Sequence, residues 1–179
     1  ISGNVVMTSP LHPSGTDRIA EAAKNISADI FVNIQGDEPL INTDDINKLV
    51  DIFNNNNIDI STLANEIDKK SALLQENVKV VLDNQGFALY FSRSIIPFNR
   101  DNIENCKYYK HIGIYAYKKN ILFDFIKLPQ SNLEKIEKLE QLRALENGYK
   151  IKVILTKNIS LSIDVQADLE RFKMQKIEL

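Results

Sequence analysis

The feature that most constrains the fold of this chain is a regular alternation of strand-like and helix-like segments near its start. Two apolar runs predict buried strands, at residues 5–8 and 30–35. Two amphipathic stretches predict helices, at residues 17–26 and 44–53. Strand, helix, strand and helix in this order are typical of a parallel sheet that is covered by helices.

The middle of the chain has a different pattern. Residues 78–92 contain two β-rich runs around the turn formers of 83–86, which predicts an antiparallel hairpin. Residues 111–118, "HIGIYAYK", predict another strand, with His111 and Tyr115 on the same face.

The longest predicted helix begins at Ser131. Ser131 and Glu134 have the spacing of a capping box, and Gly148 is a suitable C-terminal stop. An apolar stripe runs between them and is formed by Leu133, Ile136, Leu139, Leu142 and Leu145. The polar residues off this stripe are Glu137, Glu140, Gln141 and Arg143, and most of them are expected to form a solvated face.

Further strands are predicted at 150–156 and 161–165, and a last helix begins near Gln166. No linker-like segment or internal repeat interrupts the sequence. We therefore expect one α/β domain over residues 1–179, with a mixed, mostly parallel sheet and an antiparallel insertion in its second half.

Composition excludes several classes of protein. The 179 residues carry a net charge of −2 and no basic run, so neither nucleic acid nor an anionic membrane surface is an expected partner. No apolar stretch approaches the roughly 20 residues that a membrane span needs. Cys106 is the single cysteine, which excludes an internal disulfide and fits the cytoplasm.

Two carboxylates follow predicted strands. In "VNIQGDEPLI" (32–41), Asp37 comes after an apolar strand and Gly36, and in "LSIDVQADL" (161–169), Asp164 does the same. Ligands of open α/β sheets bind beyond the carboxyl ends of strands, and Mg²⁺ is often held there by one or two carboxylates and substrate phosphates. On the residues alone, Asp37 could also lie in a solvated turn, and Asp164 could cap a helix.

Other candidate site residues have equally plausible structural roles. "HPSGTDR" (12–18) leads into a helix start whose backbone N–H groups suit an anion or the polar edge of a nucleotide, or Thr16 simply caps the helix. His111 and Tyr115 could face a pocket or solvent. Arg93 could pair with a carboxylate of a ligand, or lie on the surface at a strand end.

In sequence order, these segments resemble the 3-deoxy-manno-octulosonate cytidylyltransferases, also called CMP-Kdo synthetases. The resemblance covers nearly the whole chain. "GDEP" is shared widely among nucleotidyltransferases, whereas "YFSRSIIPF", "HIGIYAY" and "LEKIEKLEQLR" are far more specific. The resemblance implies a Rossmann-like nucleotide-diphospho-sugar transferase fold and a homodimer formed through the antiparallel insertion.

The implied reaction joins CTP to an eight-carbon acid sugar for the lipopolysaccharide inner core, giving CMP-sugar and pyrophosphate with Mg²⁺. Asp37 and Asp164 would hold the metal, and Arg93 would bind the sugar carboxylate. The residues implied to line the sugar pocket are Gln35, His111, Tyr115, Glu140 and Gln141. The residues implied to lie near the nucleotide are Ser14, Gly15, Thr16 and Arg18.

The chain departs from the family pattern in two places. The first strand and the Arg- and Lys-containing loop that grips the triphosphate have no counterpart here, so we expect little or no catalysis from this chain alone. The family's proline after the second aspartate is replaced, in "IDVQADL" (163–169). Three alternatives stay open: a non-catalytic sugar-binding or dimerisation module, an enzyme for the 8-amino sugar, and an enzyme for another acid sugar such as sialic acid.

Overall fold

A computed structural model describes residues 3–36, 41–54, 58–158 and 170 of the chain. The described strands are β1 (Ile30–Asn33), β2 (Ile60–Ile67), β3 (Lys79–Leu82), β4 (Ala88–Ser92), β5 (Tyr108–Lys118) and β6 (Ile151–Thr156). The described helices are α1 (Gly15–Ala23), α2 (Thr43–Asp51), α3 (Lys69–Ala72), α4 (Lys119–Phe125), α5 (Asn132–Glu137) and α6 (Gln141–Glu146), and a 3-10 turn at Ile52–Asn54 follows α2. None of these helices is long and apolar enough to cross a membrane.

All six strands form one sheet, and β5 is its centre. The order is β4-β3-β5-β2-β6, and β1 pairs with the end of β5 that β3 leaves free. Because β1 and β2 both run antiparallel to β5, and β6 runs parallel to β2, the strands β1, β2 and β6 all point the same way. Their carboxyl ends therefore meet the same edge of the sheet.

The sheet is mixed, as expected, but the expectation that it is mostly parallel was wrong for the described strands. Only the β2–β6 pair is parallel among them, and the other pairs are antiparallel. The cause is β5, which lies antiparallel between β1 and β2 and so separates two strands that would otherwise be parallel neighbours. The predicted hairpin is confirmed as β3 and β4, which pair around the turn at 83–87.

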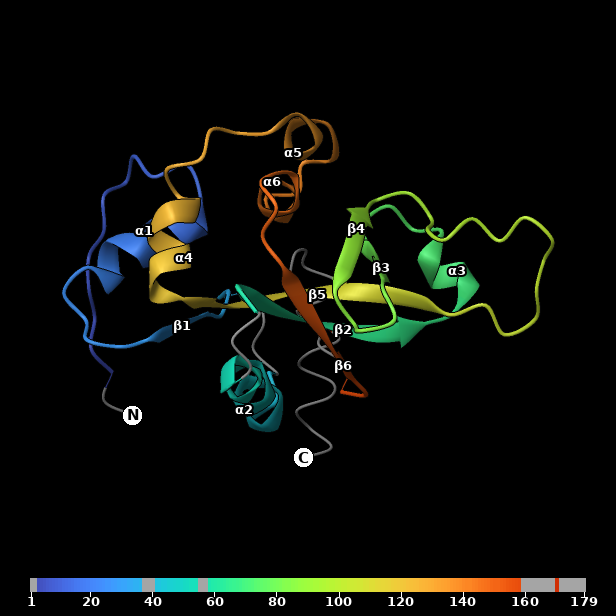
Figure 1. The fold of residues 1–179 in the computed structure, drawn as a ribbon, viewed down its shortest axis with the longest axis horizontal. Helices are drawn as coiled ribbons and strands as arrows, with labels where there is room; N and C mark the ends of the chain where they lie inside the picture. Colours follow the sequence, from blue (N-terminus) through green and yellow to red (C-terminus); the bar gives the residue numbers. More distant parts are fainter. Residues whose placement is uncertain (1–2, 37–40, 55–57, 159–169, 171–179) are drawn as a thin grey trace.

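Helices cover both faces of the sheet (Figure 1). α2 packs on one face, and α1, α4, α5 and α6 lie on the other. Each face has its own apolar core. The core under α2 includes Leu49, Phe53 and Ile114, and the larger core on the opposite face includes Phe91 and Leu142.

Several predicted elements differ in the structure. Residues 5–8 form no strand among the described residues, and Val5 and Met7 are 87% and 88% exposed. β2 was not predicted, because its run "ISTLANEI" mixes polar and apolar residues without alternating. It is nevertheless central and its first five residues are buried, since both of its neighbours and both layers of helices cover it.

The predicted long helix is broken into α5 and α6. Its capping box at Ser131 and Glu134 is confirmed, and Gly148 ends the region with a φ of 81°. However, Lys138 adopts a left-handed conformation with a φ of 55°, which ends α5 and turns the chain. Ile136, which was expected in the apolar stripe, is consequently 69% exposed. The strand predicted at 161–165 and the helix predicted from Gln166 lie outside the described residues.

Candidate functional site

The first part of the candidate site lies where β1 ends against the start of α1. Ser14, not Thr16, caps α1, because the Ser14 hydroxyl accepts a hydrogen bond from the backbone N–H of Asp17 at 3.2 Å. The Gln35 side chain lies directly over Gly15, where an added Cβ would be 3.3 Å from Gln35 Nε2. Gly15 therefore provides the close approach that brings these two segments together.

Thr16 connects α1 to α6. Its side chain is buried, and its hydroxyl donates a 2.6 Å hydrogen bond to Glu140 Oε2. Glu140 lies next to Gln141, which is only 8% exposed and whose side-chain amide has no hydrogen-bond partner among the described residues. Among the described residues, the buried side-chain polar atom without a partner is Tyr108 Oη, so the amide of Gln141 is not sealed from solvent. It is therefore accessible to a ligand.

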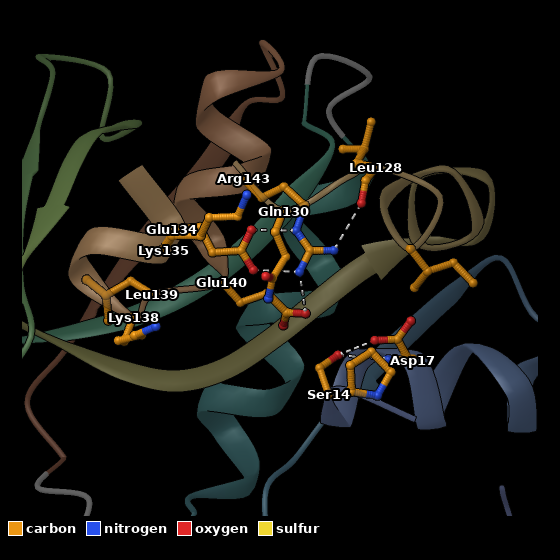
Figure 2. A pocket seen from close by; sticks show the side chains of 12 residues that line it. Ser14, Asp17, Leu128, Gln130, Glu134, Lys135, Lys138, Leu139, Glu140 and Arg143 are labelled. Carbon is orange, nitrogen blue, oxygen red and sulfur yellow. Dashed lines mark hydrogen bonds and ion pairs between the residues drawn. The ribbon is translucent and has the colours of Figure 1, made fainter. Parts of the chain in front are cut away.

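A buried ion pair holds the α5–α6 corner (Figure 2). Arg143 binds Glu134 through two hydrogen bonds of 2.7 and 2.9 Å, and it reaches Glu140 at 3.3 Å. A pocket of about 400 Å³ opens beside this corner, with Ser14 of α1 facing Glu140 across it. The expectation of a solvated face was wrong for Arg143, which is only 6% exposed.

An aromatic row runs along β5 and carries two of the predicted sugar residues. The rings of Phe91, His111, Tyr115, Tyr117 and Phe125 follow one another with centroid separations of 5.1, 5.3, 5.9 and 6.3 Å. Tyr115 is half-buried, and burial, together with the neighbouring Tyr117 and Glu140, raises its pKa well above the usual value. Its hydroxyl is therefore neutral and able to donate at physiological pH.

His111 is more deeply buried than Tyr115. Its Nε2 lies 3.0 Å from the hydroxyl of Thr62, a residue that sequence reasoning missed. Burial, with a smaller effect from Lys110, lowers the pKa of His111 to about 3. The ring is therefore neutral over the physiological range, unlike an ordinary surface histidine.

Arg93 lies at the end of β4, where it is tied to α5. Its backbone N–H donates to Glu137 Oε2 at 3.0 Å, and its Nε donates to the Glu137 carbonyl at 3.0 Å. Ser92 donates a third hydrogen bond, of 2.7 Å, to the Glu137 carboxylate. The Glu137 carboxylate, which was expected to be solvated, therefore positions the segment that carries Arg93.

Lys79 also stabilises the segment that carries Arg93, and it was not identified from the sequence. Its side chain is fully buried, and its ammonium donates to three backbone carbonyls, those of Leu74, Asn77 and Arg93. The signal was present in the sequence as a lysine inside the apolar run "VKVVL" (78–82). Lysines are almost never fully buried unless their charge is paired or hydrogen-bonded.

The structure thus brings together most of the predicted residues, with some exceptions. Gln35, Gly15, Thr16 and Glu140 form one connected group, and His111 and Tyr115 contact each other on β5. Arg18 is exposed, and its guanidinium instead binds Thr8 and Ser9 at 3.2 Å each.

The two predicted metal ligands are not placed by the structure. Asp37 and Asp164 lie outside the described residues. Within the part of the chain that the structure describes, no three His, Cys, Asp or Glu side chains are close enough to hold a metal ion. The metal assignment therefore stays a prediction.

Comparison with known proteins gives consistent matches. The sequence profile of a family described as Cytidylyltransferase matches residues 1–153. The 3-deoxy-manno-octulosonate cytidylyltransferase of Thermodesulfovibrio yellowstonii is 52% identical over an alignment of 182 positions, gaps included, and the alignment covers 94% of this chain and 71% of that protein. The protein of the same name from Flavobacterium johnsoniae is 46% identical over 173 residues, with coverages of 94% and 71%.

Solved structures agree with these relatives. CMP:2-keto-3-deoxy-manno-octonic acid synthetase complexed with CTP superposes with a TM-score of 0.93 at 38% identity, covering 99% of this chain and 74% of that one. A putative glucose-1-phosphate thymidylyltransferase from Bacillus anthracis shares the fold alone, with a TM-score of 0.59 at 17% identity over 92% of this chain and 61% of its own. These matches confirm the predicted nucleotidyltransferase fold, and the chain belongs to the cytidylyltransferase family, among the 3-deoxy-manno-octulosonate cytidylyltransferases.

Proposed function

We propose that this protein transfers CMP from CTP to 3-deoxy-D-manno-octulosonate and releases pyrophosphate. The observation that carries the proposal is the grouping of polar side chains from β1, β5 and α6 on one side of the sheet. Gln35 follows β1, Tyr115 lies on β5 and Glu140 directly precedes α6, and the contacts of α1 and the aromatic row link these three residues. The names and the identity of the relatives support the choice of substrates.

The side chains suit a polyhydroxylated acid sugar. Gln141 and Gln35 offer amides that donate and accept hydrogen bonds, and Tyr115 offers a neutral hydroxyl. Arg93 is the cation best placed for the sugar carboxylate, because only its Nε and Nη1 donate to carbonyls and its Nη2 has no partner among the described residues. Planar guanidinium geometry suits a carboxylate better than an ammonium group does.

The nucleotide is proposed to bind at the start of α1. Ser14, Gly15 and Thr16 form the first turn, where backbone N–H groups point outward and favour polar or anionic groups. Arg18 on the same helix is exposed and adds positive charge to this end.

Mg²⁺ is the proposed cofactor, with Asp37 and Asp164 as its ligands. Two carboxylates are a donor set that suits this ion, which usually completes its coordination with water and phosphate oxygens. β1 ends at Asn33, four residues before Asp37, and β6 ends at Thr156, eight residues before Asp164, and both strands end at the same edge of the sheet. When bound, the ion neutralises the triphosphate and favours attack of the sugar's anomeric hydroxyl on the α-phosphorus.

We further propose a cytoplasmic homodimer. The segment from β4 to β5 supports the dimer, because it exposes large apolar side chains, with Leu89, Phe98 and Ile103 at 61%, 81% and 69%. Exposed apolar patches are typical of interaction sites, and we propose that these three side chains contribute to one. Light scattering after gel filtration tests this, and Phe98→Asp is expected to give a monomer, whereas a wild-type monomer would contradict it.

The reaction is tested with the full protein that carries this sequence. Pyrophosphate release is measured with CTP, Mg²⁺ and 3-deoxy-D-manno-octulosonate, and then with the 8-amino sugar and with sialic acid in its place. We expect turnover with the octulosonate at a kcat/KM well above that for sialic acid. Sugar binding without pyrophosphate release would instead identify a non-catalytic module.

The metal ligands need a separate experiment. Asp37→Asn and Asp164→Asn are expected to lower Mg²⁺-dependent turnover at least a hundredfold, and to weaken Mn²⁺ binding measured by electron paramagnetic resonance. Asp44→Asn, on the exposed start of α2, is the matched control. Unchanged turnover and unchanged Mn²⁺ binding in both variants would overturn the assignment.

A further inference from the structure

Thr62 occupies an irregular point in the pairing of β2 with β5. Thr62 lies opposite Tyr115, whereas the next residue of β2, Leu63, lies opposite Ile112. One step on β2 therefore matches three steps on β5, which leaves Gly113 and Ile114 as extra residues in a bulge. At the bulge, backbone carbonyls of β5 lose their hydrogen bonds to the backbone N–H groups of β2. These buried carbonyls therefore need other hydrogen-bond donors.

The Thr62 hydroxyl meets that need. It is fully buried and lies 2.7 Å from the carbonyl oxygen of Ile114 and 3.2 Å from that of Ile112. A carbonyl oxygen only accepts, so the one proton of the hydroxyl must be directed to these oxygens. The same hydroxyl lies 3.0 Å from Nε2 of His111.

Counting protons decides the direction of this last hydrogen bond. The hydroxyl has already donated its proton to the bulge, so it must accept from the ring, and Nε2 must carry a hydrogen. In a neutral imidazole the other nitrogen, Nδ1, then has a lone pair and accepts. Nδ1 has no partner among the described residues, and His111 retains 9% of its surface.

Neighbouring aromatic rings also restrict the orientation of the His111 ring. Phe91 contacts it edge-on at 5.1 Å from one side, and Tyr115 lies 5.3 Å away along β5. Among these neighbours only Tyr115 titrates, and the other titratable group that acts on the ring is Lys110 of β5. Thr62 and Phe91, the contacts from β2 and β4, carry no charge.

We infer that Thr62 is a positioning residue, which fixes His111 in its Nε2–H form so that Nδ1 serves as a hydrogen-bond acceptor for a hydroxyl of the sugar. This inference rests on the proposed function for the identity of the ligand, but not for the state of the ring. Nδ1, as a hydrogen-bond acceptor, favours a ligand group that donates a hydrogen. It disfavours a carboxylate or phosphate oxygen, because the lone pairs of that oxygen would face the lone pair of Nδ1. His111 therefore binds a hydroxyl group of the sugar, and Arg93 binds the sugar carboxylate.

Nuclear magnetic resonance of ¹⁵N-labelled histidine tests the state of the ring directly. This chain has only two histidines, His12 and His111, so His12→Gln, a change outside the side chains proposed to bind the sugar, assigns the signals. We expect a protonated Nε2 and an unprotonated Nδ1 for His111 throughout pH 5 to 8. A hydrogen on Nδ1, or a doubly protonated ring at pH 7, would overturn the inference.

Variants of Thr62 test its positioning role. Thr62→Val keeps the shape and removes the hydroxyl, and we expect the KM for the sugar to rise roughly tenfold, as for a lost buried hydrogen bond, with little change in the KM for CTP. Thr62→Ser restores the hydroxyl and is expected to restore the KM for the sugar. An unchanged KM for the sugar in a folded Thr62→Val protein would refute the positioning role of Thr62. If that variant does not fold, the ¹⁵N spectrum of wild-type His111 still tests the inference.

A last measurement separates this inference from the proposed function. Adding 3-deoxy-D-manno-octulosonate to the labelled protein is expected to shift the ¹⁵N signal of Nδ1, and adding CTP alone is not. A correct ring state with no response to the sugar would refute the acceptor role. The proposed reaction would remain to be judged by pyrophosphate release.

Discussion

The buried ion pair between Glu134 and Arg143 offers the sharpest test of how this fold is held together. The change is Glu134→Gln, which removes one negative charge and almost no volume. Gln also retains the oxygen that completes the capping box with Ser131, so the start of α5 stays capped. The side chains of Glu134 and Arg143 are 7% and 8% exposed, so water cannot solvate the charge that is left on Arg143.

The expected loss follows from leaving Arg143 charged and buried. Removing one partner of such a pair costs about 3–5 kcal/mol. Glu140 stays within 3.3 Å of Arg143 and compensates part of the charge, so we expect the lower end, about 3 kcal/mol. With a urea dependence of about 2 kcal/mol per molar, the midpoint of unfolding would fall by roughly 1.5 M.

The assay is urea unfolding followed by circular dichroism. The matched control is Asp124→Asn, which breaks an ion pair of similar length, 2.9 Å, whose side chains are 54% and 70% exposed. Exposed pairs contribute little, so the control should change the free energy of unfolding by less than about 1 kcal/mol. If Glu134→Gln is no more destabilising than Asp124→Asn, the reasoning from burial is wrong.

Three further predictions concern single residues. Lys79→Met leaves three backbone carbonyls without their donor, so we expect urea unfolding to show a loss of about 3 kcal/mol, and a loss under 0.5 kcal/mol would contradict this. Gly15→Ala should leave stability unchanged or raise it slightly, because alanine suits a helix, yet raise the KM for the sugar several-fold by displacing Gln35; an unchanged KM would argue against that contact. The folded pKa of His111, about 3, lies below that of an unfolded histidine, so only the unfolded chain takes up its proton as the pH falls below about 6.5. Its contribution should therefore lower the free energy of unfolding by about 2 kcal/mol between pH 7 and pH 5, and His111→Gln should remove that part of the pH dependence.

Local sequence signals predicted the elements that depend on neighbouring residues. The capping box at Ser131, the stop at Gly148 and the hairpin at 83–86 were all predicted from residues a few positions apart, and they are confirmed. The failures have a different origin. The break at Lys138 has no glycine or proline to mark it, and it is fixed by the packing of α5 and α6 around Arg143.

The candidate site shows the same division. The motifs that carry Gln35, His111 and Glu140 could be selected from the sequence, because each polar residue interrupts an apolar pattern or belongs to a family motif. The sequence could not indicate Thr62 or Glu137, which resemble ordinary strand and helix residues. Their roles arise from contacts across 49 and 44 positions of the chain.

The sequence alone thus determined the α/β class, the hairpin, the capping box of α5 and the family, because these depend on short-range patterns and on ordered motifs. Only the tertiary structure decided that β5 lies antiparallel at the centre of the sheet, that a bulge beside Thr62 directs the proton of His111, and that a lysine and an arginine are buried. Strand order, bulge register and burial are properties of segments that meet in space, and no local pattern encodes which segments will meet.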